Sequence, residues 1–171
     1  NSDRHDYVLD AIKNGAVAIV ASKKINVSVP VVYVDDTNQE LLHLAKKFYD
    51  FQEDNLNLIG ITGTKGKTTS TFMIKSILEK HGFKVGLIGS IAVYIGDDEL
   101  EITDRTTPES FVIYKYLAKM VEEKVDIVIL EVSSQAMVLD RVTGIKFDGT
   151  LFTNLTEDHI SPKEHKDMED Y

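Results

Sequence analysis

Short apolar runs alternate with amphipathic segments along the whole chain. Between the apolar runs, residues 38–49 and 70–80 place apolar side chains three and four positions apart, the spacing of a helix with one buried face. Alternating strands and helices predict an α/β fold with a mainly parallel, P-loop-type sheet that carries helices on both faces. The strand-length runs rich in β-branched residues lie at positions 16–21, 29–34, 56–62, 126–131 and about 149–153.

A polar stretch at residues 50–55 divides this pattern in two. The run that follows it, 56–62, is almost continuously apolar, as expected of a strand buried on both faces in a parallel sheet. We therefore predict that residues 1–54 are part of a smaller α/β domain and that residues 55–171 are part of the P-loop-type domain. A solvated helix end of the same composition is the alternative reading of the polar stretch. We also expect this chain to be a fragment of a longer protein.

Composition limits the compartment and the partners. The chain has no Cys, which excludes disulfides and thiolate metal sites, and its apolar runs are too short to span a bilayer. The formal charge of -9 opposes binding to a phosphate backbone, so nucleic acid is not an expected partner. We expect a cytoplasmic monomer that is not inserted in a membrane and whose basic residues serve small anionic ligands.

The apolar strand that opens the second unit runs directly into the glycine-rich sequence GTKGKTT at residues 63–69, and a helical pattern follows. Gly63 and Gly66 allow tight backbone turns, so that successive N–H groups and the positive helix end can converge on an anion. Lys67 then supplies a mobile charge for the outer phosphates of a nucleotide, and the Thr68 hydroxyl can bind Mg²⁺. A glycine-rich turn that merely joins strand to helix is the alternative.

The loop departs from the usual G-x-x-x-x-G-K-[ST] spacing, because Ile61 stands where the first Gly is expected. The physical requirements for phosphate binding are still met. Lys65 either adds local positive potential or is a solvated loop lysine.

Four ordered motifs resemble those of the Mur ligase family, the ATP-dependent amide-bond synthetases of peptidoglycan synthesis. The match is closest to the members that add the third amino acid to UDP-MurNAc-L-Ala-D-Glu, and the opening residues resemble the second half of that group's uridine-binding domain. The motifs are GITGTKGKTTS (60–70), DRTTPES (104–110), LEVSSQAMVLDRV (130–142) and FDGTLFTNLTEDH (147–159).

This resemblance implies that ATP and Mg²⁺ are cofactors, and that UDP-MurNAc-dipeptide and a diamino acid are substrates. The D-Glu carboxylate would attack the γ-phosphate of ATP, and an amine would then attack the acyl phosphate. The resemblance places a carbamylated Lys and the amino-acid pocket beyond Tyr171, so lysine and diaminopimelate both stay open. The implied ATP-binding residues are Gly63, Thr64, Lys65, Gly66, Lys67, Thr68 and Thr69.

Two further side chains are predicted beside the phosphate loop. Glu131 ends the buried run 126–131 at the carboxyl edge of the sheet, where it can hold Mg²⁺, with an ordinary strand-end ion pair as the alternative. The next strand brings His159 to the same edge, where the resemblance makes it a ligand of a second Mg²⁺ or a group that orients substrate. Lys67, Glu131 and His159 are the predicted catalytic residues, and Thr68, Glu131 and His159 the metal ligands. A capping or buried His is the alternative for His159, and His165 reads as a surface residue.

The resemblance assigns the acceptor substrate to Thr106, Thr107, Ser133 and Arg141. Each has a structural alternative. Thr107 and Pro108 make a helix start, with Thr107 as the cap, and Ser133 can cap the next helix. Arg141 can form a surface ion pair instead of binding an anion with its two-pronged guanidinium.

Three competing functions stay open at this point. Another ligase of the same superfamily could act on folate, on cyanophycin or at a different muramoyl-peptide step. An unrelated P-loop kinase or GTPase is opposed by the incomplete Walker spacing and by the lack of an N-K-x-D motif. A nucleotide-binding module without catalysis is the third alternative.

Overall fold

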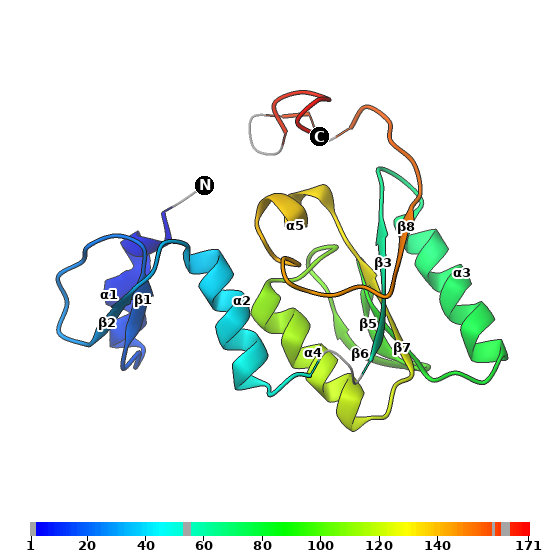
Figure 1. The fold of residues 1–171 in the computed structure, drawn as a ribbon, viewed down its shortest axis with the longest axis horizontal. Coiled ribbons are helices and arrows are strands. Elements are labelled where there is room, and N and C mark those ends of the chain that lie inside the picture. The colour runs from blue at the N-terminus through cyan, green and yellow to red at the C-terminus, as the bar shows by residue number, and fades with distance from the viewer. Residues whose placement is uncertain (1–2, 53–55, 159, 162–164) are drawn as a thin grey trace.

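The structure is a computed structural model that describes residues 3–52, 56–158, 160–161 and 165–171 (Figure 1). The predicted alternation of strands and helices is confirmed, although the first strand is shorter than its apolar run. No helix in this described part is both long and apolar enough to cross a bilayer. The elements are η1 (Arg4–Tyr7), α1 (Val8–Lys13), β1 (Ile19–Ala21), β2 (Val31–Tyr33), α2 (Thr37–Phe48), β3 (Asn57–Thr62), α3 (Lys67–Lys80), β4 (Val85–Ile88), β5 (Ala92–Ile95), β6 (Asp98–Ile102), α4 (Ser110–Glu122), β7 (Ile127–Glu131), α5 (Ser134–Val138) and β8 (Gly149–Phe152).

The main sheet has six strands in the order β6-β5-β4-β7-β3-β8. Strands β4, β7, β3 and β8 run parallel, while β5 and β6 add an antiparallel hairpin at one edge. The register pairs Ile61 with Glu131 and Thr62 with Phe152, so the carboxyl ends of β3, β7 and β8 lie level with one another. The mainly parallel sheet was predicted, and its carboxyl edge is where α/β folds bind ligands.

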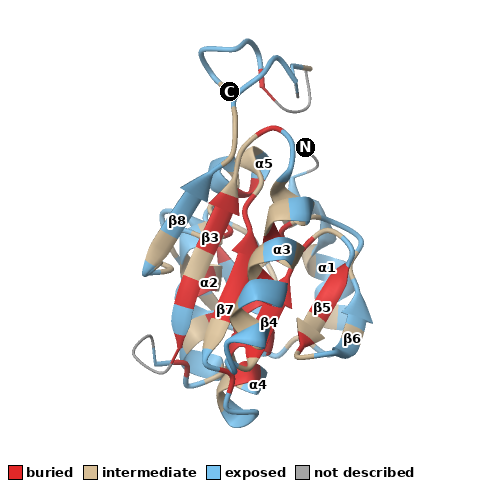
Figure 2. Ribbon diagram, turned by 90° about the vertical axis from the view of Figure 1, so that its right-hand side faces the viewer, coloured by how far each residue is buried: buried red, intermediate tan, exposed pale blue. Residues whose placement is uncertain are grey.

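Helices cover both faces of this sheet, as predicted, with α3 on one side and α4 on the other (Figure 1). On the α3 side, Ile74 and Leu78 pack against the apolar sheet residues Ile61, Val85 and Ile129. Central strands β3, β4 and β7 are largely buried, whereas the outer strands β6 and β8 are largely exposed (Figure 2). Burial on both faces explains why the central strands read as nearly continuous apolar runs.

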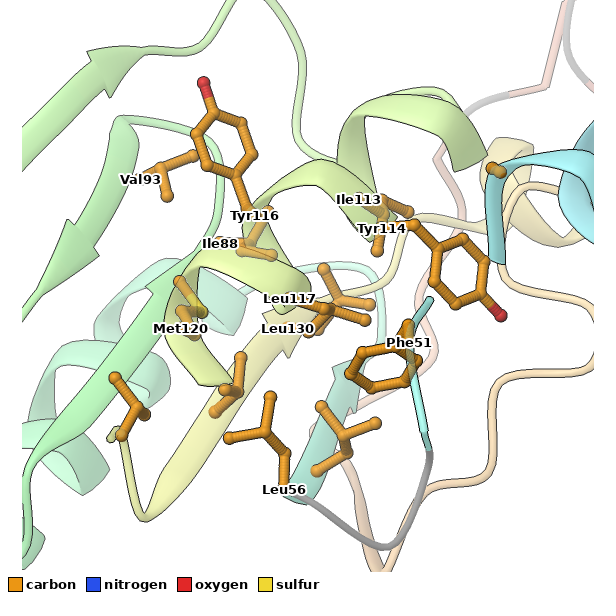
Figure 3. Close-up of a cluster of buried hydrophobic side chains, with 14 of the residues drawn as sticks. Phe51, Leu56, Ile88, Val93, Ile113, Tyr114, Tyr116, Leu117, Met120 and Leu130 are labelled. Carbon is orange, nitrogen blue, oxygen red and sulfur yellow. The ribbon is translucent and has the colours of Figure 1, made fainter. Parts of the chain in front are cut away.

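The larger core lies between the sheet and α4 (Figure 3). Ile113, Leu117 and Met120 of α4 are fully buried there against Ile88 and Leu130 of the sheet. Burying side chains of this size contributes about 1.5–3 kcal/mol each. This packing makes the sheet a rigid base for the loops at its carboxyl edge.

The first segment pairs β1 with β2 in a small parallel sheet, and α2 follows it. The Asp36 carboxylate caps α2 by accepting from the N–H groups of Asn38 and Gln39. Leu42 and Ala45 of α2 join the same core as α4. The predicted domain boundary falls in residues 53–55, which lie outside the described residues, and the division into two units stays a prediction.

Candidate active site

The loop between β3 and α3 has the backbone geometry of an anion site. Gly63 and Gly66 have φ angles of +128° and +84°, a region that side chains disfavour. The Gly66 carbonyl accepts the first bond of the α3 ladder, from Ser70 N at 2.9 Å. The N–H groups of the first turn therefore have no partner within the helix and point toward the loop, together with the positive end of the helix dipole.

Lys67 folds back over this loop. Its Nζ donates to the carbonyl oxygens of Gly63 at 2.6 Å and Thr64 at 3.2 Å. Burial lowers the pKa of Lys67, while the charges of Glu131 and Asp158 act in the opposite direction. The ammonium group is thus held at the mouth of the loop by neutral carbonyls, which an anionic phosphate can replace.

Among the other predicted loop residues, one side chain is buried and hydrogen-bonded and two are exposed. Thr64 is buried, and its hydroxyl donates to Thr156 O at 3.2 Å and accepts from Thr156 N at 3.0 Å. Lys65 and Thr69 have exposed side chains. Thr64 therefore shapes the loop, whereas Lys65 and Thr69 leave their side chains to solvent.

Glu131 is fully buried and its carboxylate is surrounded by hydroxyl groups. Thr68 Oγ1 donates to Oε2 at 3.0 Å and Ser90 Oγ to the same oxygen at 2.9 Å, while Thr71 Oγ1, which donates to Thr68 O at 2.7 Å, lies 3.4 Å from Oε1. These bonds offset the cost of burying the carboxylate. A Cβ at Gly89 would lie 2.3 Å from Oε1, so the backbone passes too close for any side chain.

Ser90, Thr71 and Gly89 were missed by sequence reasoning. Ser90 and Gly89 follow β4 directly at the carboxyl edge of the sheet. A polar residue after a parallel strand was the available signal for Ser90.

The oxygen atoms around Glu131 fit a hard divalent cation. One carboxylate with the hydroxyls of Thr68 and Ser90 suits Mg²⁺, which keeps several waters and takes its remaining oxygens from bound phosphates. Within the described ranges, no group of three or more His, Cys, Asp or Glu side chains could hold a metal alone. His159, the third predicted ligand, lies outside the described residues.

Thr107 connects two elements of the site. Its side chain is 1% exposed, and its hydroxyl donates to Glu131 O at 2.9 Å and accepts from Ser133 N at 2.9 Å. Ser133 in turn caps α5 by accepting from Ala136 N at 3.2 Å, which confirms the capping alternative. The Thr107 hydroxyl thus already has two backbone partners, and its predicted contact with substrate stays a prediction.

The predicted start of α4 was wrong. The helix begins at Ser110 with Glu109 in the cap position, so Thr107 and Pro108 lie before it. The physical reason is that the Thr107 hydroxyl is used by the end of β7 and cannot cap the helix.

Thr106 joins the predicted acceptor loop to the carboxylate. Ser90 Oγ lies 3.0 Å from Thr106 Oγ1 and 2.9 Å from the Glu131 carboxylate. One hydroxyl therefore bridges a residue predicted to contact acceptor substrate and the residue predicted to hold the metal.

Arg141 is 6% exposed and forms an ion pair with Glu109 at 3.0 Å, so the ion-pair alternative is confirmed, although the arginine is buried rather than at the surface. Its guanidinium donates to Thr107 O at 3.1 Å and to Glu109 Oε1 at 3.0 Å, and its buried Nε has no partner among the described atoms. Arg105 donates to the same Glu109 oxygen at 2.9 Å. Both arginines are therefore fixed by a shared carboxylate.

Arg141 and Arg105 line a cleft of about 560 Å³ whose other lining residues include Asp3, Arg4 and Lys23 of the first segment. Its charged lining consists of four cationic side chains and two carboxylates, a difference of two positive charges. The resemblance implied that the first segment binds the uridine substrate, but sequence reasoning named none of its residues for that role. The charged residues are Arg4, Lys23, Arg105, Arg141, Asp3 and Glu109.

His165 is 2% exposed, which corrects the prediction of a surface residue. Its Nε2 lies 2.9 Å from Ser134 Oγ, and its ring packs 5.1 Å from that of Tyr171. The segment after β8 returns to α5, a tertiary contact that no local pattern indicates.

The sequence model of the Mur ligase middle domain matches residues 61–171. The chain belongs to the Mur ligase family. The resemblance drawn from the four motifs is thereby confirmed, and the alternative of an unrelated P-loop kinase or GTPase is wrong.

Curated Mur ligases include close relatives of this chain. It is 49% identical over 172 residues to UDP-N-acetylmuramoyl-L-alanyl-D-glutamate--2,6-diaminopimelate ligase 1 of Clostridium acetobutylicum, covering 99% of the chain and 35% of the relative. The corresponding ligase of Bacillus cereus is 47% identical over 169 residues, covering 99% of the chain and 34% of the relative. The chain thus spans about a third of the length of these Mur ligases.

Solved Mur ligase structures share the fold. A UDP-N-acetylmuramoyl-L-alanyl-D-glutamate--2,6-diaminopimelate ligase aligns with a TM-score of 0.77 and 21% identity over 92% of this chain and 32% of that one. MurF from Thermotoga maritima, in complex with ADP, aligns with a TM-score of 0.57 and 21% identity over 99% of this chain and 36% of that one. These likenesses confirm the predicted fold class.

Proposed function

We propose that the full-length protein is an ATP-dependent ligase that adds diaminopimelate to UDP-MurNAc-L-Ala-D-Glu in peptidoglycan precursor synthesis. The observation that carries this proposal is the adjacency of three features at one sheet edge. These are the phosphate loop with Lys67, the buried carboxylate of Glu131, and the basic cleft lined by Arg105, whose chain neighbour Thr106 contacts Ser90 beside Glu131. The names of the relatives supply the substrate that the sequence left open between lysine and diaminopimelate.

The phosphate loop provides the electrostatic part of this reaction. Lys67 Nζ would leave the carbonyls of Gly63 and Thr64 and bind an outer phosphate of ATP, while the first-turn N–H groups of α3 bind the phosphates from the other side. Mg²⁺ held at Thr68 and Glu131, when bound, would neutralise charge on the phosphate oxygens. These groups face charge that builds up during phosphoryl transfer, so they stabilise the transition state more than the ground state.

The basic cleft suits the acceptor substrate. Its two excess positive charges match a ligand that carries a diphosphate, and the planar guanidinium groups of Arg105 and Arg141 can donate to such an anion. Thr106 follows the cleft residue Arg105 in the chain, and its Oγ1 lies 3.0 Å from Ser90 Oγ, which contacts the Glu131 carboxylate. We place the muramoyl-peptide in the cleft with its D-Glu side-chain carboxylate directed toward the phosphate loop.

The chemistry has two steps. A carboxylate oxygen of D-Glu attacks the γ-phosphorus of ATP, ADP leaves, and an acyl phosphate forms. The amine of diaminopimelate then attacks the acyl carbon, inorganic phosphate leaves, the nitrogen loses a proton, and the amide bond remains. The proposal includes ATP and Mg²⁺ as cofactors, two small-molecule substrates, a monomer and a cytoplasmic location.

Turnover of the full-length protein tests this proposal. Release of ADP and phosphate should require both UDP-MurNAc-L-Ala-D-Glu and diaminopimelate, and lysine in the same assay should support little turnover. ATP hydrolysis that ignores the muramoyl-dipeptide would refute the assignment, and a preference for lysine would refute the choice of amino acid.

A further inference from the structure

The segment that follows β8 is hydrogen-bonded to the phosphate loop through one asparagine. Asn154 Oδ1 accepts from Lys65 N at 3.0 Å, and Asn154 Nδ2 donates to Lys65 O at 2.9 Å. In addition, the main-chain oxygen of Asn154 accepts from Thr64 N at 3.0 Å. One residue thus holds the N–H groups of two consecutive loop residues and the carbonyl of the second.

The neighbouring Thr153 closes this contact. Its Oγ1 lies 2.8 Å from Lys65 O and 3.2 Å from Thr62 O, and its N–H donates to Thr62 O at 2.9 Å. A Cβ at Gly63 would lie 2.2 Å from Thr153 Oγ1 and 2.9 Å from Asn154 O. Gly63 is therefore required by the approach of this segment as well as by its positive φ.

These bonds decide which loop donors remain for a phosphate. The N–H of Thr64 and that of Lys65 are both used by Asn154, so they are not free to bind an anion. Beyond Lys65, the next donors along the loop are the N–H groups from Gly66 onward, where the first turn of α3 has no partner within the helix. Asn154 thereby fixes the peptide that leads into those donors.

We propose that Asn154 is a positioning residue for the nucleotide: it holds the Lys65 peptide so that the phosphate loop has its binding shape before ATP arrives. The inference rests on the proposed use of ATP and names a residue that acts on that site without touching the phosphates. A loop that is ordered in advance loses less conformational entropy on binding, and this difference appears as affinity. Loss of the Asn154 side chain should therefore weaken nucleotide binding selectively.

The test uses the full-length protein and the variant Asn154→Asp, which keeps size and one acceptor oxygen but replaces the Nδ2 donor with an oxygen that faces Lys65 O. Asn57→Asp is the matched control, because Asn57 Nδ2 donates to Asp126 O at 3.1 Å in an exposed bond at the opposite end of β3. Calorimetric titration with ATP and Mg²⁺, without acceptor, gives the nucleotide Kd. Steady-state kinetics gives the KM for UDP-MurNAc-L-Ala-D-Glu.

We expect Asn154→Asp to raise the nucleotide Kd at least about tenfold while the KM for the muramoyl-dipeptide stays near wild type. Asn57→Asp should change neither. An unchanged nucleotide Kd in Asn154→Asp overturns the inference, as does an equal weakening of both substrates together with a lower Tm. Wild-type protein that binds no ATP would instead overturn the proposed function along with the inference.

Amide hydrogen exchange gives a second readout that needs no nucleotide. In the ligand-free protein, the Lys65 amide is protected by Asn154 Oδ1, so Asn154→Ala should accelerate its exchange. Exchange at Lys65 as slow as in wild type would overturn the proposed clamp even if Asn154→Ala lowers the overall stability.

Discussion

Replacing Arg141 by Lys tests the acceptor half of the site. The guanidinium spans two partners in the loop before α4, Thr107 O at 3.1 Å and Glu109 Oε1 at 3.0 Å, and it lines the basic cleft. A Lys ammonium is a single point of charge and cannot reproduce that fork. Loss of one charge-assisted hydrogen bond to substrate costs about 1.5–3 kcal/mol. At about 1.4 kcal/mol per tenfold, the affinity for the muramoyl-dipeptide should fall roughly 10- to 150-fold.

The assay uses the full-length enzyme in the steady state. ATP and UDP-MurNAc-L-Ala-D-Glu are titrated in turn, with the remaining substrates held at saturation. Arg141→Lys should raise the KM for UDP-MurNAc-L-Ala-D-Glu by that factor and leave the KM for ATP near its wild-type value. Equal rises for both substrates would indicate general disruption of the sheet edge. No change in either would remove Arg141 from substrate recognition.

A stability control separates recognition from scaffolding. Arg141→Lys leaves the buried Thr107 carbonyl short of a donor, which should cost about 1–3 kcal/mol of unfolding free energy. Arg105 donates to the same Glu109 oxygen, but its side chain is 42% exposed. Arg105→Lys should therefore cost less than about 1 kcal/mol.

Three further changes test the phosphate and metal sites. Lys67→Ala should lower kcat/KM at least about 100-fold with the fold intact, since the described partners of its Nζ are the loop carbonyls of Gly63 and Thr64, and near-wild-type turnover would contradict the loop assignment. Glu131→Gln keeps size but removes charge, so activity should fall and recover in part at raised Mg²⁺; an unchanged Mg²⁺ response would remove Glu131 from the site. Gly89→Ala places a Cβ 2.3 Å from Glu131 Oε1 and should lower turnover. Gly149→Ala is the control, because its Cβ would have no described atom within 4 Å, and its turnover should stay near wild type. Equal turnover of the two variants would show that the position of the carboxylate is unimportant.

The phosphate loop and Glu131 could be predicted from sequence because each belongs to a motif of consecutive residues. An apolar strand followed by glycines, a Lys and a helix defines the loop, and a second apolar strand ends in the carboxylate. Parallel strands bring their carboxyl ends to one edge, so the two motifs had to lie close together. The structure brings Thr68 Oγ1 within 3.0 Å of Glu131 Oε2.

The roles of Thr107 and His165 could not be predicted, because long-range partners decide them. The Thr-Pro pair satisfies the local rules for a helix start, yet the Thr107 hydroxyl bonds to Glu131 O and Ser133 N, far along the chain. His165 is buried only because its segment returns to Ser134. In both cases the position of the side chain is set by the hydrogen-bond partner that a buried polar group requires, and not by the local sequence preference.

The basic cleft could not be predicted from the net charge of the chain. The chain carries a formal charge of -9, but local potential depends on which side chains the fold brings together. The four cations of the cleft come from η1, the segment after β1, the loop before α4 and the loop after α5. They therefore form no cluster of basic residues in the sequence. Glu109 accepts from two of these cations, and Arg4 lies 3.7 Å from its other oxygen. An anionic ligand in the cleft must therefore compete with Glu109 for the same guanidinium groups, and a ligand with two negative charges does so better than one with a single charge.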